Sequence, residues 1–273
     1  MSHKDLLYSY KHYNHNLRFM FKKYKLEHMF PALEHLIHNN ITYDANLYAI
    51  LHKAYNIACN DHPNKAICEA EFDDLANAQL TVQNITTLFQ TANIQPQITT
   101  YLDIGSATGR KSSYIGTQLH AKQILCLDIQ NDEYKINPHT QCKFQYYDGI
   151  HPPYAHNTVD LITSFMVIHH VPKNNLPTLL TNLHNTLTPN GLFIISEHDS
   201  NHNLAALINN QHDLILSVKK DYEFNTIDKI NERNYMSYDE LKQIFEQNGF
   251  KLLANMFINN PTKNYLALYQ RVN

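Results

Sequence analysis

The chain has 273 residues, a formal net charge of −3 at pH 7 and 43% hydrophobic residues. A small negative charge argues against broad electrostatic capture of nucleic acid, and no apolar run reaches the ~18 residues that suggest a membrane span. The polar, aromatic start "MSHKDLLYSYKHYNHN" is not typical of a secretory signal. We therefore expect a cytoplasmic protein with no membrane association.

The four cysteines are Cys59, Cys68, Cys126 and Cys142, and no two of them form a C-x-x-C pair. Cys126 and Cys142 belong to apolar segments with the character of strands. This pattern predicts buried, reduced thiols in a cytosolic protein.

Residues 1–95 are predicted to be helical. Apolar residues recur at helical spacing in three segments, and the first hundred residues contain no glycine. Basic residues exceed acidic ones over residues 1–40, with tyrosines and histidines between them. We expect this region to form a lid over a cleft, or a surface for an acceptor or partner. The segment "NIQPQ" (93–97) marks the predicted boundary with a second domain at 96–273.

From residue 98 onward, short β-branched strands alternate with amphipathic helices. This order predicts a parallel sheet with helices on both faces. The segment "SYDE" (237–240) predicts a capping box at the start of a late helix that ends at Gly249. The last two strands, joined by "NNPTK", predict a hairpin. The expected fold is thus a Rossmann-like, doubly wound α/β sheet, mostly parallel, with an antiparallel last strand and an α-helical N-terminal region before it.

Three acids follow three successive predicted strands. In "YLDIGSATGR" (101–110) the strand ends at Asp103, and Gly105 and Gly109 follow. Asp128 ends the second strand, at a spacing from which a carboxylate reaches ribose hydroxyls. Asp148 ends the third, where it could meet an adenine amine. A pyrophosphate would avoid the first carboxylate, so the pattern favours an adenosine with a cationic amino-acid tail, which is S-adenosylmethionine.

With these motifs the chain resembles the class I S-adenosylmethionine-dependent methyltransferases over about residues 98–272. "YLDIGSATGR", "LDIQ", "YYDGI", "DLITSFMVIHHV" and "LTPNGLFIISEHD" are similar to successive motifs of that family, although Ala107 stands where most members have glycine. The resemblance implies a transferase that uses S-adenosylmethionine. It implies that the following residues bind the cofactor: Asp103, Gly105, Ser106, Gly109, Asp128, Ile129, Asp148, Gly149, Ser164 and Phe165.

Candidate catalytic residues follow the fourth and fifth predicted strands. They are His169, His170, Glu197 and His198, and we expect one of the paired histidines to face the acceptor and the other to pack. A general base is needed only if the acceptor holds its proton at neutral pH, so a structural role for these residues stays open. His198 and His202 have the spacing of metal ligands on a helix, but no further ligand is placed with them and no metal site is predicted.

The sequence does not identify the methyl acceptor. The mild acidity favours a small molecule, and RNA methylated on a base or on cap guanine is the alternative. RNA ribose methylation with a Lys-Asp-Lys-Glu set is disfavoured, because "SFM" and "SEHD" stand at the expected places. A non-catalytic binding or activating subunit is a second alternative. A nicotinamide-dependent oxidoreductase is disfavoured, because the chain lacks G-x-G-x-x-G after the first strand.

Overall fold

The structure is a computed structural model that describes residues 75–129, 141–200, 234–259 and 263–272, together with Arg18 and Lys22. Arg18 and Lys22 are helical and exposed. The other predicted helices before residue 75, and His202, lie outside the described residues. No helix in the described ranges combines the length and the apolar character that crossing a membrane requires.

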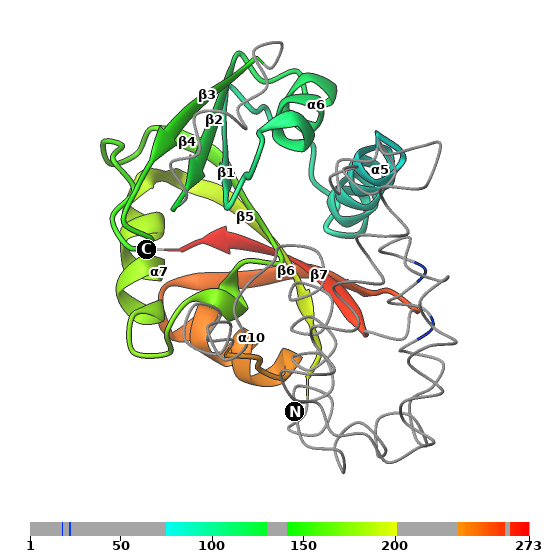
Figure 1. Cartoon of the computed structure of the whole chain (residues 1–273), viewed down its shortest axis with the longest axis vertical. Coiled ribbons are helices and arrows are strands. Elements are labelled where there is room, and N and C mark those ends of the chain that lie inside the picture. Colours follow the sequence, from blue (N-terminus) through cyan, green and yellow to red (C-terminus); the bar gives the residue numbers. More distant parts are fainter. Residues whose placement is uncertain are drawn as a thin grey trace, which may run out of the picture. The chain divides into compact units, whose positions relative to one another are not determined.

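Seven strands form one sheet in the order β3-β2-β1-β4-β5-β7-β6 (Figure 1). Neighbouring strands are parallel from β3 through β5, and β7 is antiparallel to both β5 and β6. The predicted mostly parallel sheet with an antiparallel last strand is therefore confirmed. The strands are β1 (Thr100–Ile104), β2 (Gln123–Asp128), β3 (Cys142–Tyr146), β4 (Val159–Phe165), β5 (Leu187–His198), β6 (Phe250–Phe257) and β7 (Asn264–Arg271).

Helices cover both faces of the sheet. Successive side chains of a strand point to opposite faces of the sheet. In β5, Phe193 and Ile195 pack against one pair of helices, and Leu192 and Ile194 pack against the other pair. The first pair is α7 (Leu176–Thr186) and α10 (Tyr238–Gln247), and the second is α5 (Leu75–Thr91) and α6 (Arg110–Gln118) (Figure 1). The result is the three-layer arrangement expected for a doubly wound sheet.

The predicted capping box of α10 is present. Ser237 accepts a hydrogen bond from the Glu240 backbone N–H at 3.2 Å, and the Glu240 carboxylate accepts one from the Ser237 N–H at 2.9 Å. Gly249 ends the helix with φ of +83°, a conformation that disfavours residues with a Cβ. The two caps fix where α10 begins and ends.

The fifth strand begins at Leu187, before the glycine of the motif "LTPNGLFIISEHD". Leu187 pairs with Val159, and Leu192 then pairs with Leu161. Four residues of β5 thus lie opposite the single residue Asp160, which makes a bulge. Asp160 Oδ2 also accepts the backbone N–H groups of Thr99 and Thr100 at 2.8 and 2.9 Å. The bulge therefore lies where Asp160 anchors the start of β1.

The chain divides into two compact units. One comprises Met1–Glu71 with Asn201–Glu232, and the other comprises Phe72–Ser200 with Arg233–Asn273. The boundary expected at residue 95 falls inside the second unit, because Ile85 and Leu88 of α5 are buried in the same core as β1 and β7. Helical periodicity identified α5 but not the domain to which it belongs.

The prediction of reduced thiols is wrong for two cysteines. Cys126 of β2 and Cys142 of β3 form a disulfide, with Cα atoms 6.0 Å apart. Neighbouring parallel strands bring them together, since Ile124 pairs with Cys142 and Cys126 with Phe144. Among the described residues there is no free cysteine, while Cys59 and Cys68 lie outside them.

Candidate functional site

The site lies where β1, β2 and β4 end side by side. Parallel strands direct their carboxyl ends to one edge, and the chain changes direction between β1 and β4, because β2 and β3 lie on one side of β1 and β4 on the other. Ligands of open α/β sheets bind at such a switch point. Asp128 and Phe165 are the last residues of β2 and β4, and Asp103 precedes Ile104, the last residue of β1, so the structure brings these predicted residues to one edge.

The loop after β1 turns tightly through residues with positive φ. Gly105 and Gly109 have φ of +70° and +73°. The N–H groups of Gly105 and Ser106 both donate to the Leu127 carbonyl, at 2.7 and 3.0 Å, which holds the loop against β2. A Cβ on Gly105 would overlap with the Val167 side chain. Glycine is thus required at residue 105 both for its backbone angle and for the close approach of the segment after β4.

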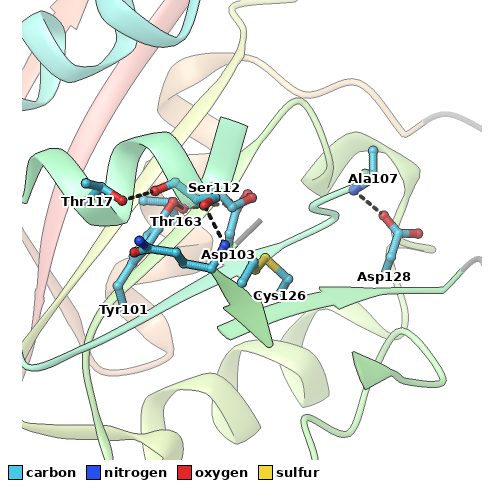
Figure 2. Close-up of a disulfide and its surroundings, with 11 residues drawn as sticks. Tyr101, Asp103, Ala107, Ser112, Thr117, Cys126, Asp128 and Thr163 are labelled. Carbon is cyan, nitrogen blue, oxygen red and sulfur yellow. Dashed lines mark hydrogen bonds between the residues drawn. A yellow bond between two sulfur atoms is a disulfide. The ribbon is translucent and has the colours of Figure 1, made fainter. Parts of the chain in front are cut away.

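Ala107 adopts positive φ, +48°, although it has a Cβ. An alanine in this region costs about 1–2 kcal/mol relative to right-handed backbone. Its N–H donates to Asp128 Oδ2 at 2.8 Å, and Figure 2 shows the Asp128 carboxylate directed at Ala107. The loop therefore keeps the turn that a glycine would make, and Asp128 holds it there.

Asp103 is buried and hydrogen-bonded within the protein. Oδ1 accepts from the Thr163 hydroxyl and Oδ2 from the Ser112 hydroxyl, both at 2.5 Å (Figure 2). Burial raises the pKa of Asp103 to about 6, against the opposing effect of these two hydrogen bonds. Asp103 thus joins β1 to α6 and β4. Its direct contact with a cofactor stays a prediction, and Ser112 and Thr163 are partners that the sequence analysis missed.

Asp148 lies two residues beyond the end of β3, not at its end as expected. Asp148 is exposed. Its Oδ2 is hydrogen-bonded to Nδ1 of His151 at 2.6 Å, and its Oδ1 accepts hydrogen bonds from the backbone N–H groups of Ile150 and His151. These hydrogen bonds, led by that of the His151 ring, lower the pKa of Asp148 to about 2. Asp148 therefore remains an anion, but most of its hydrogen bonding is local.

Ile129 presents an apolar side chain beside this loop. It is 57% exposed, and its Cγ2 would lie 3.3 Å from a Cβ on Gly149, which has φ of +86°. The absence of a side chain at residue 149 keeps the Ile129 surface open on that side. An exposed apolar surface next to Asp128 is suited to the face of a base.

Two buried hydroxyls at this edge fit a polar ligand. Ser106 and Ser164 are buried, and within the described part of the chain their Oγ atoms make no hydrogen bond to protein. Buried hydroxyls normally have a partner. Ser106 follows β1 and Ser164 lies near the end of β4. The donor and acceptor set here, two hydroxyls and the Asp128 carboxylate, fits the polar groups of S-adenosylmethionine.

A buried Glu–His pair lies next to the edge, at the ends of β4 and β5. Glu197 Oε2 is 2.6 Å from His169 Nδ1, and Oε1 accepts the Ile168 N–H at 2.7 Å. Burial alone would raise the pKa of Glu197, but His169, His198 and these hydrogen bonds lower it below its usual value. An ionised carboxylate can only accept a hydrogen bond, so Nδ1–H of His169 is the donor in this pair.

The other predicted catalytic residues surround this pair. His169 and His198 are buried, whereas His170 is exposed. The ring centroids of His170 and His198 lie 4.3 and 5.8 Å from that of His169. Tyr235 stacks on His169 at 4.6 Å. His169 is thus packed and His170 exposed, while contact of His170 with the acceptor stays a prediction. Tyr235 was not among the predicted site residues, because its position beside His169 depends on tertiary packing.

Asp199 has a structural partner. Its Oδ1 accepts the backbone N–H of Tyr238 at 2.9 Å, at the first residue of α10. The two acids that flank His198 therefore have different partners. Glu197 is hydrogen-bonded to His169, and Asp199 is hydrogen-bonded to the first residue of α10. No group of three potential metal ligands occurs among the described residues.

Residues 72–255 match the family model described as "Methyltransferase domain". Among curated proteins, none matches the chain.

Similar solved structures share the fold at low sequence identity. The CurJ carbon methyltransferase is 16% identical with a TM-score of 0.51, over 72% of this chain and 54% of that one. Human N-acetylserotonin methyltransferase, in complex with SAM, is 16% identical with a TM-score of 0.50, over 70% and 52%. The Burkholderia thailandensis 1,6-didemethyltoxoflavin-N1-methyltransferase, bound to its substrate and S-adenosylhomocysteine, is 14% identical with a TM-score of 0.50, over 84% and 91%. The chain thus spans about half the length of the first two.

Proposed function

The chain belongs to the class I S-adenosylmethionine-dependent methyltransferases, and we propose that it transfers the methyl group to a small-molecule acceptor at the ends of β4 and β5. The observation that carries the proposal is the buried Glu197–His169 pair with the exposed His170 beside it. These residues adjoin the edge where β1, β2 and β4 end. An acceptor held there would lie next to the cofactor.

Several residues are proposed to hold the cofactor. Asp128 would accept the ribose hydroxyls, since a carboxylate offers about four lone-pair sites. Ile129 would support the adenine, and Asp148 would accept its amine. The hydroxyls of Ser106 and Ser164 would bond to the polar amino-acid end. Asp103 joins β1 to α6 and β4 through Ser112 and Thr163, and its direct contact with the cofactor stays part of the proposal.

When bound, S-adenosylmethionine supplies an electrophilic methyl group on a sulfonium. Much of the rate enhancement can then come from alignment of the acceptor. Glu197 fixes the tautomer and orientation of the His169 ring, so that Nε2 can take a proton where the acceptor carries one. His170 is the exposed member of the cluster and is proposed to contact the acceptor.

The acceptor class rests on charge and on the solved relatives. The net charge of −3 gives little attraction for a polyanion. One relative is named for N-acetylserotonin and another for 1,6-didemethyltoxoflavin, both small molecules. RNA is the alternative, supported by the basic excess in residues 1–40, where Arg18 and Lys22 are exposed.

The test is transfer of a tritiated methyl group to four acceptor pools in parallel: a metabolite extract, uncapped RNA, capped RNA and protein. We expect label in the metabolite extract alone. Label in either RNA pool would replace the proposed acceptor class. Cofactor binding without label in any pool would favour a non-catalytic binding subunit.

A further inference from the structure

Buried hydroxyl groups supply hydrogen bonds to the Asp103 carboxylate, directly and through one another. Thr163 and Ser112 donate to its two oxygens at 2.5 Å, and Tyr101 Oη lies 2.7 Å from Thr163 Oγ1 (Figure 2). The one hydroxyl hydrogen of Thr163 points to Asp103, so Tyr101 is the donor to Thr163. Burial raises the pKa of Tyr101 well above its ordinary value, so its hydroxyl keeps the proton. Tyr101 and Thr163 thus form a hydroxyl relay whose hydrogens point toward Asp103.

Two strands and a helix hold the relay in place. Tyr101 and Asp103 are two residues apart in β1 and so point to the same face of the sheet. Thr163 of β4 lies opposite Asp103 in the register of the two strands. Helix α6 leaves room for the Tyr101 ring, because a Cβ on Gly116 would lie 2.9 Å from Tyr101 Cδ1. The relay is therefore part of the packing between β1, β4 and α6.

The hydrogen bonds oppose the cost of burying the Asp103 charge. Burial is the largest influence on the pKa of Asp103, which is raised to about 6. The hydrogen bonds from Ser112 and Thr163 lower this pKa, and so does Lys111 of α6, whereas Asp128 of β2 raises it. Asp103 is therefore ionised at neutral pH, with hydroxyl donors that compensate for part of the desolvation.

Protonation of Asp103 would disturb this arrangement. A neutral carboxyl carries a hydrogen on one oxygen, whereas here both oxygens face hydroxyl donors. One of the hydroxyls of Ser112 and Thr163 would then have to turn away or reverse, and the negative charge near the end of β1 would be lost. S-adenosylmethionine carries a sulfonium and an ammonium group, and S-adenosylhomocysteine carries the ammonium. Affinity for either ligand should therefore fall when Asp103 is protonated.

We propose that Thr163 and Tyr101 are positioning residues that hold the Asp103 carboxylate ionised and oriented, and so set the pH below which the chain loses its cofactor. The inference rests on the proposed function, because it takes the cofactor to bind at the edge where β1, β2 and β4 end. It assigns neither residue a contact with the cofactor, and neither belongs to the predicted set.

The test is calorimetric binding of S-adenosylhomocysteine to the full chain between pH ~5 and pH ~8. The wild type is compared with Thr163→Val, which removes the hydroxyl at similar volume, with Tyr101→Phe, and with the double variant. Tyr269→Phe is the matched control, because Tyr269 is also buried and its Oη makes no hydrogen bond within the described part of the chain. The histidines also titrate in this range, but they are the same in every variant. Thermal melting reports whether each variant is folded.

The wild type should lose affinity roughly tenfold between pH ~7 and pH ~5, as expected for a ligand that prefers the ionised form of a carboxyl with a pKa of about 6. Thr163→Val should move the midpoint of this loss up by about one to two pH units, because it removes a hydrogen bond to a charged group. Tyr101→Phe should move it up by roughly 0.2–0.5 unit, since it only weakens the Thr163 hydrogen bond. It should have no further effect in the Thr163→Val background, and Tyr269→Phe should behave as the wild type.

An unchanged midpoint in Thr163→Val would overturn the proposal. An equal loss of affinity at every pH would also overturn it, because Thr163 would then only support the fold. A full effect of Tyr101→Phe in the Thr163→Val background would remove Tyr101 from the relay. In each case the wild type still binds the ligand, so the proposed function survives.

If Thr163→Val does not fold, Tyr101→Phe decides the test, and Thr163→Ser, which keeps the hydroxyl, should retain the wild-type midpoint. An unchanged midpoint in Tyr101→Phe would then overturn the proposal. No binding of S-adenosylhomocysteine to the wild type at any pH would refute the proposed function, and the inference would fail with it.

Discussion

At the scale of single residues, the buried Asp103 makes stability depend on pH. Burial raises its pKa from 3.8 to about 6 in the folded protein. As the pH rises from about 4 to 6, the unfolded chain loses this proton before the folded protein does. The contribution of Asp103 to stability is therefore full below pH ~4 and decreases through pH ~6, by about 3 kcal/mol for a shift of about two units.

The measurement is the free energy of unfolding of the wild type and of Asp103→Asn at several pH values. The difference, wild type minus variant, should decrease by about 3 kcal/mol between pH ~4 and pH ~7. A difference that does not change with pH would show that the Asp103 carboxyl is not held in the environment described.

The paired histidines should separate stability from activity. His169 is buried and bonded to Glu197, so His169→Ala leaves a buried carboxylate unpaired and should cost about 3–5 kcal/mol. His170 is exposed, so His170→Ala should change stability by less than about 0.5–1 kcal/mol. If His170 contacts the acceptor, this variant should still lower kcat/KM at least about tenfold. Wild-type kcat/KM in His170→Ala would remove it from the site.

Sequence reasoning placed acids near the strand ends but did not predict their hydrogen-bond partners. Acids at strand ends are visible in the chain, because strand boundaries and glycines lie next to them. The bonds of Asp103 to Thr163 and Ser112 depend on which strands become neighbours and how α6 is rotated. The stacking of Tyr235 on His169 depends in the same way on tertiary packing, so no local pattern predicted it.

At the scale of elements, the disulfide should stabilise the pairing of β2 with β3. Its cysteines are 16 residues apart in sequence, and closing a loop of this size stabilises a protein by about 3 kcal/mol. A dithiol reductant should therefore lower the Tm of the wild type. It should not change the Tm of the Cys126→Ser, Cys142→Ser double variant, which is the control. The chain has four cysteines, so a thiol assay that detects four free thiols in the untreated native protein would contradict the disulfide.

The elements themselves were predictable where their signals are local. The apolar periodicity and capping residues of α10 define it from Ser237 to Gly249. The early start of β5 was not predictable, because it depends on a pairing between Leu187 and Val159 across the sheet. The pairing of Cys126 with Cys142 likewise follows from strand neighbours, which composition does not reveal.

At the scale of the whole molecule, the basic N-terminal segment distinguishes the two acceptor classes. For a small-molecule acceptor, a Lys22→Ala, Lys23→Ala, Lys25→Ala variant should methylate as the wild type does and should bind RNA no more weakly. If RNA is the acceptor, each lost phosphate contact flattens the salt dependence by about one counterion. Anisotropy of labelled RNA between about 50 and 200 mM salt measures this. Salt-dependent binding that the triple variant abolishes would favour RNA.

The central claim is that S-adenosylmethionine binds where β1, β2 and β4 end, and Asp128 tests it most directly. Asp128→Asn keeps an oxygen for the Ala107 N–H but removes the charge proposed to bind the ribose. Calorimetry with S-adenosylhomocysteine should show binding to the wild type and roughly ten- to a hundredfold weaker binding to Asp128→Asn, with a similar Tm for both. Wild-type affinity in Asp128→Asn, or no binding to the wild type, would contradict the account.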